Sequence, residues 1–171
     1  MGNNAGRRRI VVAGVGVGAV IAYAALLAVQ ELVLDPLAAV PGTPLDVIYA
    51  HLDGQGFDVR SDVVGVLVIA AIGVVLALVV AVVTSWKRVG AHFVAAWFLG
   101  VLAAGAIPAF AAGFQLGMDV ADGYGVSGED HTVWAGVLYV TSVIALVAIP
   151  VVIVVGERRR ARLTTSGTLV A

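Results

Sequence analysis

The stretch that decides the fold is residues 10–34, which read IVVAGVGVGAVIAYAALLAVQELVL. The only charged residue in this stretch is Glu31. A hydrocarbon core about 30 Å thick is crossed by about 20 helical residues. The chain enters the stretch through three arginines, Arg7 to Arg9, and leaves it at Asp35. We therefore expect a transmembrane helix whose basic end lies in the cytoplasm.

The whole composition agrees with a membrane protein. The chain has 171 residues, of which 61% are hydrophobic and 12% are charged, and its mean hydropathy is +1.05. A soluble domain usually has about 25% charged residues. Three further apolar runs are long enough to span, at residues 63–86, 91–116 and 132–155. Backbone amides inside a bilayer must be satisfied within their own segment, which favours helices. We predict an all-α integral membrane protein, a single domain over residues 1–171 that forms an antiparallel bundle of four transmembrane helices.

The charges are sorted by sign along the chain. Nine of the ten basic residues lie in the tails 1–9 and 156–171 or in the short loop after residue 86, and Arg60 is the exception. All acidic residues except Glu157 lie in residues 31–62 or in the loop 117–131. Positive residues mark cytoplasmic loops. The pattern predicts a multi-pass protein of the cell membrane with both termini in the cytoplasm (N-in/C-in) and outer loops at residues 35–62 and 117–131.

The first outer loop also contains a helix signal. Thr43-Pro44-Leu45-Asp46 resembles a capped helix start, and apolar residues at helical spacing continue to Gly54, a common stop. We expect a short interfacial helix there. In the second outer loop, Ser127 is the expected N-cap of the fourth span.

Small residues predict which helix faces pack together. Membrane helices associate through small residues that let backbones approach closely. The expected packing positions are Gly14, Gly18, Gly73, Gly105 and Gly113, with a bend at Pro108 because proline removes one helical hydrogen bond.

One hydrogen bond between helices is also expected. Tyr23 and Ser142 lie at similar depth in the first and fourth spans, so Tyr23 should bond to Ser142 or to its neighbour Thr141. The alternative is that both hydroxyls bond to carbonyls of their own helix.

Several function classes fit poorly. Residues 14–19 match G-x-G-x-x-A, but the run continues apolar to Leu34, whereas a nucleotide-binding turn needs a strand before it and an amphipathic helix after it. The same run is too long for a cleaved signal, so we expect it to remain as an anchor. No cysteine is present, which excludes disulfides and thiol chemistry. We expect no nucleotide or nucleic-acid partner, no metal and no cofactor.

The candidate site is a polar vestibule at the outer end. Its predicted members are Gln30, Glu31, Asp35, Gln115 and His131, which lie at comparable height on three spans. Acids within spans often mark ion pathways. The alternative is that Glu31 and Asp35 end a helix at the headgroups.

Three functions remain open. No charge lies at the expected midplane and no catalytic constellation is evident, so we favour a non-enzymatic accessory or structural protein. It would act through contacts with the lipid bilayer, other membrane proteins or a second copy. The alternatives are a small transporter or channel using the vestibule around Glu31, and a membrane enzyme with an outward-facing site.

Overall fold

The structure is a computed structural model that describes residues 2–87 and 89–168, with side chains placed for residues 6–87 and 89–160. Four stretches are long and apolar enough to cross a membrane, and they confirm the predicted all-helical membrane protein. They are Gly6–Ala39, Val59–Trp86, Ala91–Tyr124 and Val133–Arg160. The elements, in chain order, are α1 (Gly2–Val29), the π-helix η1 (Gln30–Leu34), α2 (Asp35–Ala39), α3 (Leu45–Gln55), α4 (Val59–Trp86), α5 (Ala91–Ala104), α6 (Ala106–Tyr124) and α7 (Val133–Thr168).

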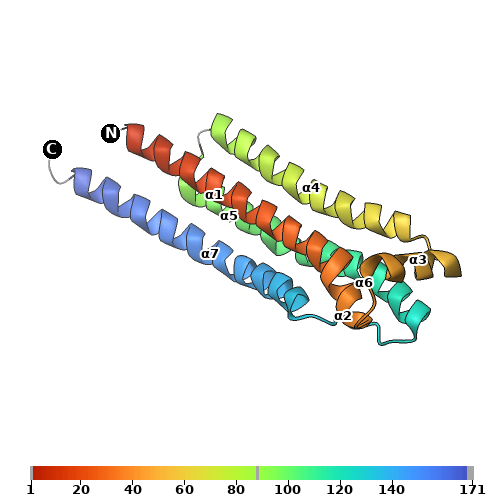
Figure 1. Ribbon diagram of the computed structural model, residues 1–171. Helices are drawn as coiled ribbons and strands as arrows, with labels where there is room; N and C mark the ends of the chain where they lie inside the picture. Colours follow the sequence, from red (N-terminus) through yellow and green to blue (C-terminus); the bar gives the residue numbers. More distant parts are fainter. Residues whose placement is uncertain (1, 88, 169–171) are drawn as a thin grey trace.

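The long helices run side by side and alternate in direction (Figure 1). α1 packs against α4 and α5, and α5 also packs against α7. Both chain ends lie at one end of the bundle together with the turn between α4 and α5, and we call this the basic end. α2, α3 and the last turns of α6 form the opposite, acidic end (Figure 1).

The helices extend beyond the predicted spans. α1 already begins at Gly2 and α7 continues to Thr168, so most of the two predicted tails is helical. Hydropathy alone reports where a helix leaves lipid, not where it ends.

The predicted helix in the first outer loop is present, with different ends. Its N-cap is Pro44 and no side chain caps it, so the expected role of Thr43 is wrong. The helix ends one residue later than Gly54, at Gln55, and Gly56 adopts the left-handed conformation with φ 94°. Glycine carries no Cβ, so this conformation has no steric cost there.

The start of α7 also differs from the prediction. Thr132, not Ser127, caps the helix, because its Oγ1 accepts a hydrogen bond of 3.2 Å from the backbone N–H of Trp134. Ser127 instead donates to Glu129 within the exposed loop.

The third span is interrupted close to the expected bend. α5 ends at Ala104 and α6 begins at Ala106, so the irregular residue is Gly105. Pro108 lacks the N–H that a continuous helix would donate to Ala104. The absence of a side chain at Gly105 leaves room for the ring of Tyr23, because a Cβ added there would lie 2.9 Å from Tyr23 Cε1.

The Tyr23–Ser142 hydrogen bond lies beside this break. The two hydroxyl oxygens are 3.0 Å apart, and Ser142 Oγ donates to the carbonyl of Leu102 at 2.9 Å. Three spans therefore meet at one hydroxyl. Thr141 instead donates to the carbonyl of Val137 in its own helix.

The glycine faces are only partly where the sequence placed them. Gly14 and Gly18 are exposed, and nothing lies within 4 Å of a Cβ added at Gly14, Gly18 or Gly73. The contact of α1 with α5 uses Gly16 instead, which is buried under the ring of Phe98. A residue two positions away lies on a different face of a helix, so the predicted face of α1 points away from the bundle.

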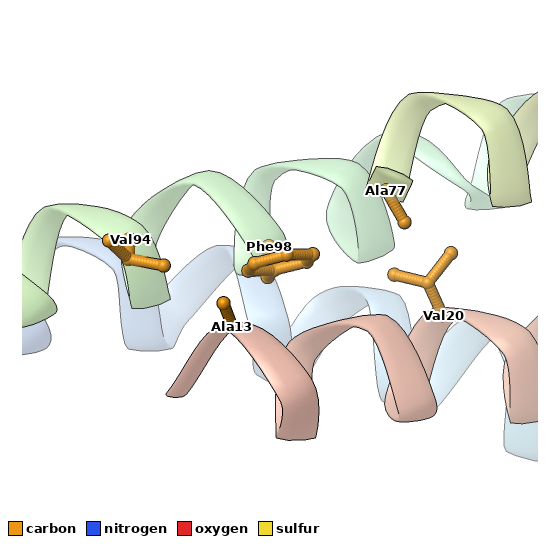
Figure 2. Packing of buried hydrophobic residues seen from close by; sticks show 5 residues of the cluster. All are labelled: Ala13, Val20, Ala77, Val94 and Phe98. Atoms are coloured by element: carbon orange, nitrogen blue, oxygen red, sulfur yellow. The ribbon is translucent and has the colours of Figure 1, made fainter. Parts of the chain in front are cut away.

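The interior is filled by three apolar layers. Nearest the basic end, α1, α4 and α5 bring together Ala13, Val20, Ala77, Val94 and Phe98 (Figure 2). The middle layer contains Leu27, Ala109 and Leu138. The layer at the acidic end packs α3 against its neighbours through Ala39, Ile48, Leu52, Val59 and Val120.

Candidate functional site

The site forms around a π-helical turn at the end of the first span. The N–H of Asp35 donates to the carbonyl of Gln30, which is five residues earlier. This spacing widens the helix by one residue and stacks Asp35 above Gln30. As a result Gln30, Glu31 and Asp35 are all buried, with exposed fractions of 0%, 6% and 8%. π-turns inside α-helices are frequent at functional sites.

The segment before α7 is bonded onto this turn. Thr132 Oγ1 donates to Gln30 Oε1 at 2.6 Å, and the backbone N–H of His131 donates to Asp35 Oδ1 at 2.7 Å. The imidazole Nδ1 of His131 lies 3.6 Å from Asp35 Oδ2. Gln30 Nε2 lies 3.5 Å from Asp35 Oδ1, at the outer limit of a hydrogen bond. We call Gln30, Glu31, Asp35, His131 and Thr132 the polar cluster.

Glu31 is seated against a glycine. A Cβ added at Gly113 of α6 would lie 2.6 Å from Glu31 Oε2 and 3.0 Å from Cδ. Among the described residues no basic side chain forms an ion pair with Glu31, and its nearest charges are the carboxylates of Asp35 and Asp130. A larger residue at position 113 would therefore have to displace this carboxyl group.

Asp130 stands in the loop beside the cluster. Loss of water around its carboxyl group raises the pKa of Asp130, and the nearby Asp35 carboxylate raises it further, while His131 acts in the opposite direction. Acids near one another disfavour each other's charged form.

The cluster contains most of the predicted vestibule. Gln30, Glu31, Asp35 and His131 come together, from η1, α2 and the loop before α7. Gln115 does not join them, because its side chain is exposed on α6. Height along a span does not determine which way a helical residue points.

Three contributing residues were missed by sequence reasoning. Thr132 was unremarked, although a threonine directly before an apolar run is a common helix cap. Tyr49 of α3 donates from its hydroxyl to the carbonyl of Leu32 at 2.6 Å, which ties the outer helix to the π-turn. Asp62, 9% exposed, lies beside the carboxyl group of Asp119, and it was assigned to the outer loop although it belongs to the first turn of α4.

Burial and charge act together on Tyr49. Burial raises the pKa of Tyr49 to about 12, and the nearby Asp62 carboxylate contributes in the same direction. The phenol is therefore neutral at physiological pH and remains a hydrogen-bond donor to Leu32.

In the part of the chain with described side chains, no group of three or more His, Cys, Asp or Glu side chains is arranged to hold a metal ion. The Nε2 of His131 lies 3.4 Å from Ser127 Oγ, whereas its buried Nδ1, 3.6 Å from Asp35 Oδ2, has no hydrogen-bond partner among the described residues. The geometry is that of a hydrogen-bonded junction between α1, α2 and α7.

Comparisons with known proteins add no family. No family model matches the chain, and neither the search of curated proteins nor the search of solved structures returned a match.

Proposed function

We propose that this chain is a non-enzymatic accessory or structural component of the cell membrane that acts through contacts with lipids, other membrane proteins or a second copy. The observation that carries the proposal is the apolar packing directly beneath the polar cluster. Leu27, Ala109 and Leu138 are 3%, 2% and 1% exposed, and they fill the bundle between Glu31 and the basic half. Water and ions at the acidic end thus meet a closed layer.

The basic half also has an apolar core, between α1, α4 and α5. Phe98 of α5 lies directly on Gly16 of α1, and Ala13 and Val94 flank this contact (Figure 2). Between the two apolar layers lie the hydroxyls of Tyr23 and Ser142, which bond to one another and to a backbone carbonyl. This packing of the described residues argues against a continuous polar route for an ion through a single chain.

The outer face of α1 supports a role in contacts. Gly14, Gly18 and Ala22 are exposed and spaced four residues apart, so they lie along one stripe of the helix. Such a stripe lets a second helix approach closely in lipid. Because this stripe is exposed in the single chain, it is available for contact with a helix of a partner. Cytoplasmic segments of membrane proteins carry an excess of Lys and Arg, which further supports a cytoplasmic location for the basic end.

Site-specific photo-crosslinking in cells tests the contact function. A photoreactive amino acid at Gly18 should give an adduct of discrete mass, because a partner helix lies within reach. The matched control is Val75 on α4, which is 57% exposed and should contact lipid only. A chain that forms no adduct at Gly18 and behaves as a monomer in mild detergent would contradict the proposal.

Buried carboxyl groups support a second candidate, a small transporter or channel. Glu31 and Asp35 lie inside the first spanning stretch, and intramembrane acids are typical of ion and proton pathways. Proteoliposomes containing the full chain and a pH-sensitive dye separate the two functions. The contact function predicts no flux above empty vesicles. Flux that Glu31→Gln abolishes, and that Asp53→Asn at an exposed position leaves intact, would establish the transporter instead.

A further inference from the structure

A cavity opens at the basic end, far from the polar cluster. It has a volume of about 790 Å³ and is lined by residues of α1, α5 and α7, all of which have one end at the basic end of the bundle (Figure 1). Ligand pockets in proteins are commonly about 300–1,000 Å³. We propose that this cavity binds the headgroup and upper acyl chain of an anionic phospholipid. The inference deepens the lipid half of the proposed function and rests on it.

The mouth of the cavity is strongly basic. Arg7 and Arg8 of α1 and Arg159 of α7 line it, and all three are exposed. None of the three forms an ion pair with a described side chain. Guanidinium groups bind phosphate oxygens through paired hydrogen bonds. Three unpaired guanidinium groups around one cavity therefore suit a phosphate-bearing group.

The deeper walls are apolar. Val11 and Val12 of α1 and Ala95 of α5 line the cavity one helical turn below the arginines. Four residues of helix correspond to about 6 Å along the axis. The lining thus changes from charge to hydrocarbon over the distance that separates a lipid phosphate from its acyl chains. A free phosphate would use the arginines alone and would leave these walls empty.

On one side of the cavity, a histidine connects α5 to α7. The ring of His92 in α5 is packed on Gly156 of α7, where an added Cβ would lie 2.8 Å from Cδ2. His92 Nε2 lies 3.0 Å from Glu157 Oε1. This contact joins α5 to α7. The Glu157 carboxylate, which lies near the cavity, is therefore paired with His92 and not with an arginine of the cavity mouth. Basic pockets between membrane helices on the cytoplasmic side are recognised headgroup sites.

The test compares two double variants of the full chain in detergent. Arg8→Gln with Arg159→Gln removes two charges from the cavity, and Lys87→Gln with Arg158→Gln removes two charges from the same end outside its lining. Phosphatidylglycerol binding is measured by native mass spectrometry, with phosphatidylcholine and inorganic phosphate as further probes. Circular dichroism confirms that each variant is folded.

The cavity variant should bind phosphatidylglycerol about thirtyfold more weakly, which corresponds to about 2 kcal/mol, and the control should change by less than about threefold. Phosphatidylcholine should not compete. Ala95→Leu narrows the apolar part of the cavity without changing charge, and it should weaken lipid binding as well.

Equal losses of lipid binding in both double variants would overturn the site, because general surface charge would then explain the binding. Inorganic phosphate binding as tightly as the lipid would also overturn it. Neither result would affect flux or crosslinking at Gly18, so the proposed function is judged separately.

Discussion

Replacing Gly16 with alanine tests how the first and third spans pack. A methyl group at this position would overlap the ring of Phe98, with Cδ1 at 2.8 Å and two further ring atoms closer. Carbon atoms in contact normally lie about 3.5–4.0 Å apart. The ring is 3% exposed and enclosed by Ala13 and Val94, so α1 and α5 must separate to admit the methyl group.

The magnitude follows from two opposing effects. Overpacking a well-filled interior costs about 1–3 kcal/mol. Alanine gains about 1 kcal/mol over glycine in helix propensity. Gly14→Ala makes the same chemical change two residues away, where nothing lies within 4 Å of the new methyl group. Because the propensity gain is common to both, Gly16→Ala should be less stable than Gly14→Ala by about 1–3 kcal/mol.

The assay is equilibrium unfolding in mixed detergent micelles with increasing dodecyl sulfate, followed by far-ultraviolet circular dichroism. In a Phe98→Ala background the space is open, and Gly16→Ala should no longer destabilise the chain. Equal stabilities of Gly14→Ala and Gly16→Ala would refute the reasoning. A loss confined to Gly14→Ala would indicate that α1 is rotated so that the Gly14 face packs against its neighbours.

Three further substitutions test the acidic end. Tyr49→Phe should cost about 1 kcal/mol near neutral pH, because it removes the hydrogen bond to Leu32. The raised pKa of Tyr49 implies a stabilising contribution that is complete below pH 10 and lost as pH rises through about 12. Unfolding at pH 8, 10 and 12 should therefore show a smaller alkaline loss in the phenylalanine variant than in wild type, and equal losses would count against the burial of this phenol. Thr132→Ala should cost about 1–3 kcal/mol, because it removes the helix cap and leaves Gln30, which is 0% exposed, without its partner. Ser127→Ala should change stability by less than about 0.5 kcal/mol, and a thermal unfolding series that ranked the two substitutions the other way would show that Ser127 is the cap after all.

The apolar runs predicted the architecture because membrane insertion is a one-dimensional constraint. Length and hydropathy of residues 10–34 and of the three later runs require helices, since a bilayer offers backbone amides no other partner. Tyr23 and Ser142 were paired from depth alone, and the structure contains that hydrogen bond. Properties that depend on position along the membrane normal can be read from the chain.

Which face of each helix points into the bundle was decided only by the tertiary structure. The spacing of Gly14 and Gly18 is the same whether that face meets a neighbour or lipid, and in the folded chain Gly16 makes the contact. Nothing local distinguishes the π-turn at Gln30 from a regular turn, yet it buries Gln30, Glu31 and Asp35 together. Its stability comes from Thr132 and His131, about a hundred residues away, whose hydrogen bonds form only when the first and fourth spans are side by side.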